Sequence, residues 1–82
     1  MKKYEQVLVE FYNTVAEKTV ASTDQIPVHV LDFLLTIPYV QLVRPLILRD
    51  LQKNSALTER YLAIRYSVGR QVVRTIRGTY QA

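Results

Sequence analysis

The sequence has no cysteine, only two glycines and a single histidine. The absence of cysteine excludes disulfides, thiolate zinc sites and thiol catalysis. The two glycines form no phosphate-binding loop, and the chain has neither a Ser/His/Asp set nor a His/Glu spacing suited to a metal. His29 lies among apolar residues, where we expect a structural role. The sequence therefore predicts a protein that is not an enzyme and uses no cofactor or metal.

Long apolar runs are lacking as well. In the most apolar part of the chain, the longest uncharged run covers residues 33–43, and these 11 residues are too few to cross a bilayer. The first residues show no apolar stretch of the signal-peptide type. A chain of 82 residues is long enough for one core but not for an enclosed substrate cavity. We expect a single domain over 1–82, cytoplasmic, with no membrane partner and no small-molecule substrate.

Charge is distributed unevenly along the chain. Residues 1–43 carry three Lys or Arg and five Asp or Glu, whereas residues 44–82 carry eight Lys or Arg and two acids. Seven of the eight cations in the second half are arginines, whose planar guanidinium suits phosphates and base edges. The basic half is therefore the candidate surface for a polyanion.

Apolar residues recur at helical spacing along most of the chain, which predicts an all-α fold, a compact domain of four or five helices. The first helix is expected over residues 3–18, with an apolar face and a polar face. A short buried helix should follow, although the β-branched content of residues 26–30 leaves a strand open. That helix is expected to be formed by Val30, Leu31, Phe33, Leu34 and Leu35.

Two further helical segments are expected beyond residue 37. One runs over residues 38–53, with a break near Arg44 because Pro45 follows it. The next begins after Thr58, whose side chain is a good helix N-cap. We expect residues 1–54 to form a helical support that also serves as the dimerisation region.

The last third of the chain carries the most informative pattern. Ala63 stands four residues before Ser67, and Val68 and Gly69 follow directly. Residues 58–80 thereby resemble the helix-turn-helix DNA-binding family, in which a small residue lies where two helices cross and a glycine forms the tight turn. An apolar residue then points inward and a small polar residue caps the second helix. Ser67 and Gly69 depart from the residues usual at those two places.

The resemblance implies a function for the second helix. Val73 and Ile76 are spaced to pack inward, so the opposite face is expected to meet the major groove of double-stranded DNA. Arg60, near the start of the preceding helix, is expected to contact a phosphate. The protein would then be a sequence-specific transcriptional regulator that binds as a homodimer, because one helix pair reads few base pairs. The residues assigned to DNA binding are Arg60, Gly69, Arg70, Gln71, Arg74, Thr75 and Arg77.

Two other functions stay open. The same basic face suits an acidic protein partner, which would make the chain an interaction module without DNA. A DNA-packaging or replication accessory protein would share the DNA contacts but lack a regulatory role. Salt-dependent binding to a duplex would distinguish a DNA-binding protein from the interaction module. The sequence does not distinguish a regulator from a packaging or replication accessory protein.

Overall fold

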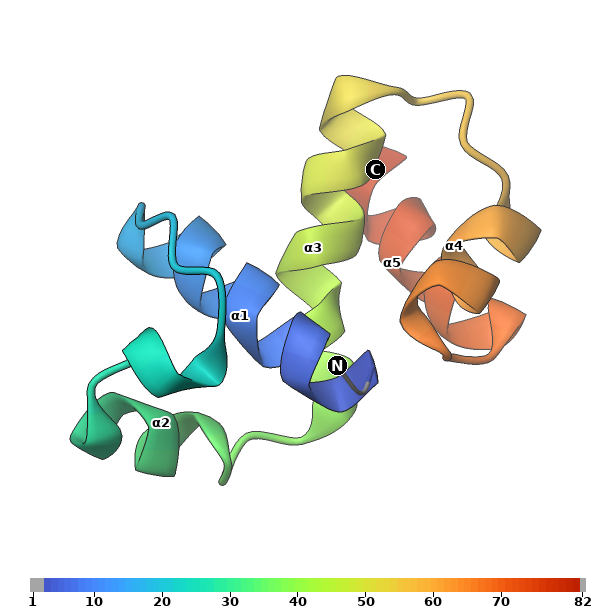
Figure 1. Cartoon of the computed structure of the whole chain (residues 1–82). Coiled ribbons are helices and arrows are strands. Elements are labelled where there is room, and N and C mark those ends of the chain that lie inside the picture. Colours follow the sequence, from blue (N-terminus) through green and yellow to red (C-terminus); the bar gives the residue numbers. More distant parts are fainter. Residues whose placement is uncertain (1–2, 82) are drawn as a thin grey trace.

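Five α-helices and one short 3₁₀ turn make up the part of the chain that the structure, a computed structural model, describes, residues 3–81 (Figure 1). No strand occurs in these residues, so the predicted all-α domain is confirmed and the alternative of a strand over 26–30 is excluded. The elements in chain order are α1 (Lys3–Ala16), η1 (Thr23–Gln25), α2 (Val28–Leu34), α3 (Tyr39–Lys53), α4 (Glu59–Tyr66) and α5 (Arg70–Gln81).

Helix α3 lies at the centre of the fold, with α1 packed against it on one side and α5 on the other (Figure 1). Its buried side chains recur at spacings of one, three and four residues, which gives it a broad apolar surface. All five helices contribute to the one hydrophobic core that surrounds α3. The fully buried side chains of α3 are Leu42, Val43, Leu46, Ile47 and Leu51.

Pro45 lies inside α3, and the helix continues through it from Tyr39 to Lys53. The prediction of a break near Arg44 is therefore wrong. Proline removes one backbone N–H, so the carbonyl of Gln41 loses its usual helical partner. Gln41 is exposed, and water can replace the missing donor.

Helix α1 ends at Ala16, two residues earlier than predicted. Glu17 adopts a left-handed backbone with φ of 55°, and the N–H of Lys18 donates to the carbonyl of Asn13 at 3.1 Å. The side chain of Asn13 also exchanges two hydrogen bonds with the backbone of Val20, at 2.9 and 3.0 Å. These bonds satisfy carbonyl and amide groups at the helix end and reverse the chain toward η1.

Helix α2 is only partly buried, so the prediction of a buried helix is wrong for some of its residues. Leu34 is buried, but Phe33 is 65% exposed and Leu35, just after the helix, is 50% exposed. A helix of seven residues can bury only the face that it turns to the core, and Leu34 lies on that face. Among the described residues no single helix is long and apolar enough to cross a membrane; α2 and α3 reach that length only together, and they bend by 99° where they meet.

Candidate nucleic-acid interface

Helices α4 and α5 occupy the range in which the sequence predicts a helix pair, and they pack directly against each other. Helix α4 begins after Thr58, whose hydroxyl oxygen accepts the N–H of Tyr61 at 3.0 Å, as its predicted capping role requires. Ala63 is buried in this packing and Val73 is fully buried on α5. A side chain larger than alanine at this position would push the two helices apart.

The turn between α4 and α5 is three residues long and has one left-handed residue. Ser67 has φ of 55° and ψ of 48°, a conformation that costs a non-glycine residue energy. The N–H of Val68 reaches back to the carbonyl of Ala63 at 3.0 Å, which closes the helix end. Gly69 has no positive φ, and its carbonyl accepts the N–H of Val72 at 3.1 Å. Ser67 therefore provides the backbone reversal that the predicted turn needs.

The outer face of α5 is polar and open to solvent. Val73 and Ile76 are 0% and 4% exposed, which fixes the inward side of the helix. A helical turn of 100° per residue then directs Gln71, Arg74 and Thr75 outward, and all three are exposed. Three of the residues predicted to bind DNA thus share the side of α5 that faces away from the core.

Three predicted arginines gather at one edge of this face. Arg60, Arg70 and Arg77 line a shallow hollow of about 340 Å³ beside Thr58, at the N-terminal end of α4. Arg77 donates to the carbonyl of Ser55 at 3.2 Å, which holds its guanidinium against the α3–α4 loop. The carboxylate of Glu59 also lines the hollow, but the three arginines outnumber it. Together with the N-terminal end of a helix, their excess positive charge favours an anion there.

Arg74 has an acidic neighbour on α4. Its guanidinium lies 3.4 Å from a carboxylate oxygen of Glu59, and its side chain is 64% exposed. An ion pair this exposed is worth about 0 to 1 kcal/mol, so a competing anion can displace it. Arg74 is consequently available to a partner at small cost.

The other edge of the α5 face meets α3. Gln71 and Thr75 line a hollow of about 210 Å³ together with Gln41 and Arg44 of α3. The hydroxyl of Thr75 donates to the carbonyl of Gln71 at 3.0 Å, which leaves the oxygen free to accept. The predicted DNA-binding residues therefore divide between two edges of α5. Arg44 was absent from the predicted set, because only its charge marks it in the sequence.

Two arginines of the basic half lie away from this face, in a cluster of ionised side chains between α1, α3 and α4. Arg49 lies 3.2 Å from Glu10 and 3.0 Å from Asp50. Arg65 lies 3.2 Å from Glu10 and 3.3 Å from Asp50. The hydroxyl of Tyr66 donates to Asp50 and accepts from Arg49. We call these five residues the inner cluster; its two cations and two carboxylates leave it neutral.

The environment of the inner cluster shifts the pKa of its members. Burial raises the pKa of Tyr66 to about 12. The hydrogen bond with Arg65 lowers this pKa, and Asp50 raises it further. The hydrogen bond with Tyr66 raises the pKa of Arg65 above its ordinary value. Burial lowers the pKa of Arg49, but hydrogen bonds with Asp50 and Glu10 outweigh this effect and raise it. Both guanidinium groups remain charged, and the phenol remains neutral at neutral pH.

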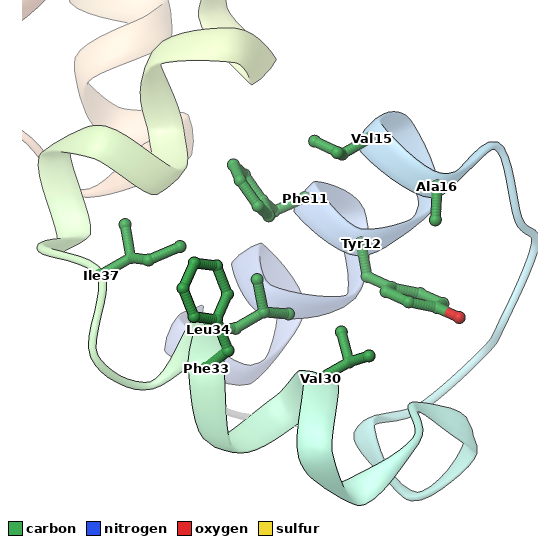
Figure 2. Close-up of a pocket in the computed structure, with 8 residues that line it drawn as sticks. All are labelled: Phe11, Tyr12, Val15, Ala16, Val30, Phe33, Leu34 and Ile37. Atoms are coloured by element: carbon green, nitrogen blue, oxygen red, sulfur yellow. The ribbon is translucent and has the colours of Figure 1, made fainter.

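An apolar groove of about 410 Å³ lies between α1 and α2 (Figure 2). Figure 2 shows Phe11 of α1 and Phe33 of α2 on facing walls of the groove. No charged side chain lines it. Its lining consists of Phe11, Tyr12, Val15, Ala16, Val30, Phe33, Leu34 and Ile37.

The function of this chain is not transferred from a relative. The chain matches no protein-family model, and no curated protein or solved structure is significantly similar to it. Its function is therefore inferred from its own residues and their geometry.

Proposed function

We propose that this protein binds double-stranded DNA through the outer face of α5 and acts as a sequence-specific transcriptional regulator. The observation that supports the proposal best is the division of α5 into two sides. Val73 and Ile76 are buried, while Gln71, Arg74 and Thr75 face solvent. A helix with one packed side and one side of hydrogen-bonding residues is suited to insertion into a groove of matching chemistry.

The dimensions of the two partners agree with this proposal. An α-helix with its side chains is about 10 to 12 Å across, and the major groove of B-DNA is about 12 Å wide. With α5 in the groove, Arg74 is placed to pair with guanine and Gln71 with adenine, each through two hydrogen bonds. Arg60, Arg70 and Arg77 would border the groove, where the phosphates lie.

The arrangement of charge concentrates the positive potential on this side. Arg49 and Arg65 are paired with carboxylates in the inner cluster. The arginines at α5 and at the start of α4 have a single acidic partner in the described residues, Glu59, which pairs weakly with Arg74. A polyanion therefore meets its strongest attraction at the α5 face.

We also propose that the protein binds DNA as a homodimer, because one helix pair contacts only a few base pairs. The apolar groove between α1 and α2 is the surface assigned to the second copy. Phe33 stands at the groove with 65% of its surface exposed, so a two-fold contact would let each copy insert Phe33 into the other. Phe33→Ser should reduce the dimer fraction in sedimentation velocity, while Val28→Ser, at an exposed α2 position outside the groove, should not. A strictly 1:1 complex on DNA would contradict the dimer.

The experiment that tests DNA binding is selection of preferred duplexes from a random pool, followed by footprinting of the selected site. The proposal predicts a preferred site, protected over two half-sites about 34 Å apart or a multiple of that distance. Affinity should fall steeply as salt rises, because bound phosphates release counterions. Binding without any sequence preference would instead favour a DNA-packaging or replication accessory.

An acidic protein partner is the second candidate function, and the hollow lined by Arg60, Arg70 and Arg77 is the observation that favours it. Guanidinium groups bind carboxylates as well as phosphates. Competition between a selected duplex and poly-glutamate of equal charge separates the candidates. If poly-glutamate displaces the duplex at equal charge concentration, an interaction module with an acidic partner explains the protein better than DNA binding does.

A further inference from the structure

A second cationic edge borders the outer face of α5, and α3 supplies it. The hollow there is lined by the apolar side chains of Val40, Val72 and Ile76 and by Arg44. Arg44 is exposed, and within residues 3–81 no carboxylate lies within ion-pair distance of it. The aliphatic part of an arginine can lie along apolar side chains while its charged end stays in water.

Arg44 and the hollow of Arg60, Arg70 and Arg77 lie on opposite edges of α5. The α3 hollow contains Gln71 and Thr75, whereas the α4 hollow contains Arg70 and Arg77. On a helix these two pairs of positions are separated by about 100° to 160° around the axis. A duplex that receives α5 would therefore meet positive charge on both sides of the inserted helix.

The major groove has negative charge along both of its edges, which matches the positive charge on both sides of α5. Its two edges are the phosphate backbones of the two strands, about 12 Å apart. A helix with cations at only one edge would contact one strand. A helix with cations at both edges is held at a defined depth and tilt, which the base contacts need.

We infer that Arg44, with Gln41 beside it, forms a binding site for a backbone phosphodiester on the DNA strand opposite to the one that Arg60, Arg70 and Arg77 contact. This inference rests on the proposed DNA binding and extends its surface beyond α4 and α5. It places the first half of α3 in the interface, although α3 lies outside the helix pair that the sequence singles out. Gln41 can add a neutral hydrogen bond from its amide.

The test compares Arg44→Ala with wild type on a selected duplex and on a scrambled duplex, over a range of salt concentrations. Arg44→Ala should weaken binding to both duplexes by about three- to tenfold and lower the slope of log affinity against log salt by about one unit. Its base preference should be unchanged, because a phosphate contact carries no sequence information. Arg44→Lys should restore most of the salt slope.

The matched control is Lys18→Ala, which removes one positive charge at an exposed position two residues after α1 ends. Lys18→Ala should leave the slope of log affinity against log salt almost unchanged. The comparison therefore distinguishes a local contact of Arg44 from a general effect of net charge. Equal slopes for Arg44→Ala, Lys18→Ala and wild type would overturn the inference while leaving DNA binding in place. A wild-type protein that binds no duplex at low salt would overturn the proposed function itself. In ethylation interference at the selected site, Arg44→Ala and Arg60→Ala should each lose interference at phosphates of different strands.

Discussion

The arginines of this protein form two groups that differ in what surrounds them. Arg49 and Arg65 belong to the inner cluster, where Glu10 and Asp50 neutralise them and Tyr66 completes their hydrogen bonds. The outer group lies on α3, α4 and α5 and faces solvent or shallow hollows. The outer group consists of Arg44, Arg60, Arg70, Arg74 and Arg77.

The difference separates arginines that are paired inside the fold from arginines whose charge is open to solvent. An arginine enclosed by carboxylates fixes the positions of the helices that carry them, and removing one partner leaves the others uncompensated. An exposed arginine adds little to stability, so its charge is available for a partner. Stability should therefore depend on the inner cluster and polyanion binding on the outer group.

The largest expected effect comes from opening the inner cluster. Asp50→Ala removes the carboxylate that pairs with Arg49 and Arg65 and accepts the hydroxyl of Tyr66. We expect it to lower the free energy of unfolding by about 2 to 4 kcal/mol, measured by urea titration. Asp32→Ala, an exposed acid on α2, is the matched control and should have little effect. Equal effects of the two substitutions would mean that the inner cluster does not stabilise the fold.

The next largest effect is expected where α4 and α5 cross. Ala63→Leu introduces a larger side chain where α4 and α5 pack, and should destabilise the fold by about 1 to 3 kcal/mol. Ile64→Leu is the control, because Ile64 is 66% exposed on the next position of α4. Calorimetric melting of the two variants measures the difference. A neutral Ala63→Leu would show that the crossing tolerates a wider spacing.

Tyr66→Phe tests the inner cluster through its pH dependence. Burial raises the pKa of Tyr66 to about 12, so the folded state holds this proton more tightly than the unfolded chain, whose tyrosine pKa is about 10. The resulting stability is complete below about pH 10 and is lost as the pH rises to about 12.

The cost of Tyr66→Phe should accordingly be about 1 to 2 kcal/mol at pH 7 and should shrink between pH 10 and 12. Urea unfolding of both proteins over this pH range provides the measurement. Tyr61→Phe, at an exposed position of the same helix, controls for loss of a hydroxyl. A cost that stays constant up to pH 12 would contradict the enclosed position of the Tyr66 phenol.

The smallest expected effect is a gain in stability at the turn between α4 and α5. Ser67 is left-handed with φ of 55°, and Ser67→Gly should stabilise the fold by about 0.5 to 1 kcal/mol. Glu17→Gly replaces the other left-handed residue, at the end of α1, and should give a similar gain there. Thermal melting compares the two. A loss of stability on Ser67→Gly would contradict the left-handed turn.

The sequence predicted the helices of the second half well, because apolar spacing and local caps decide where they begin and end. The cap at Thr58 and the end of α3 at Lys53 depend on residues within one or two turns. Predictions failed where distant packing decides. Phe33 is exposed because α2 turns only one face, with Leu34, to the core. Helix α3 passes through Pro45 because its other side chains are anchored in the core.

For the candidate site, the sequence indicated which residues of α5 face outward but not what lies beside them. Arg70 and Gln71 are neighbours in the chain, yet Arg70 lines the hollow on α4 and Gln71 the hollow on α3. The inner cluster was not predicted either. Glu10 and Asp50 are 40 positions apart, and only the packing of α1 on α3 brings their charges to Arg65.

The most direct test of the central claim replaces three outer residues together. In Arg70→Ala/Gln71→Ala/Arg74→Ala, the fold should keep the helical circular dichroism and nearly the melting temperature of wild type, because all three side chains are exposed. Fluorescence anisotropy should show that the variant binds the selected duplex no more tightly than a scrambled duplex. Its affinity for each duplex should also be lower than that of wild type. Unchanged affinity and unchanged sequence preference in a folded triple variant would contradict the account, because the outer face of α5 would then not be a DNA-binding surface.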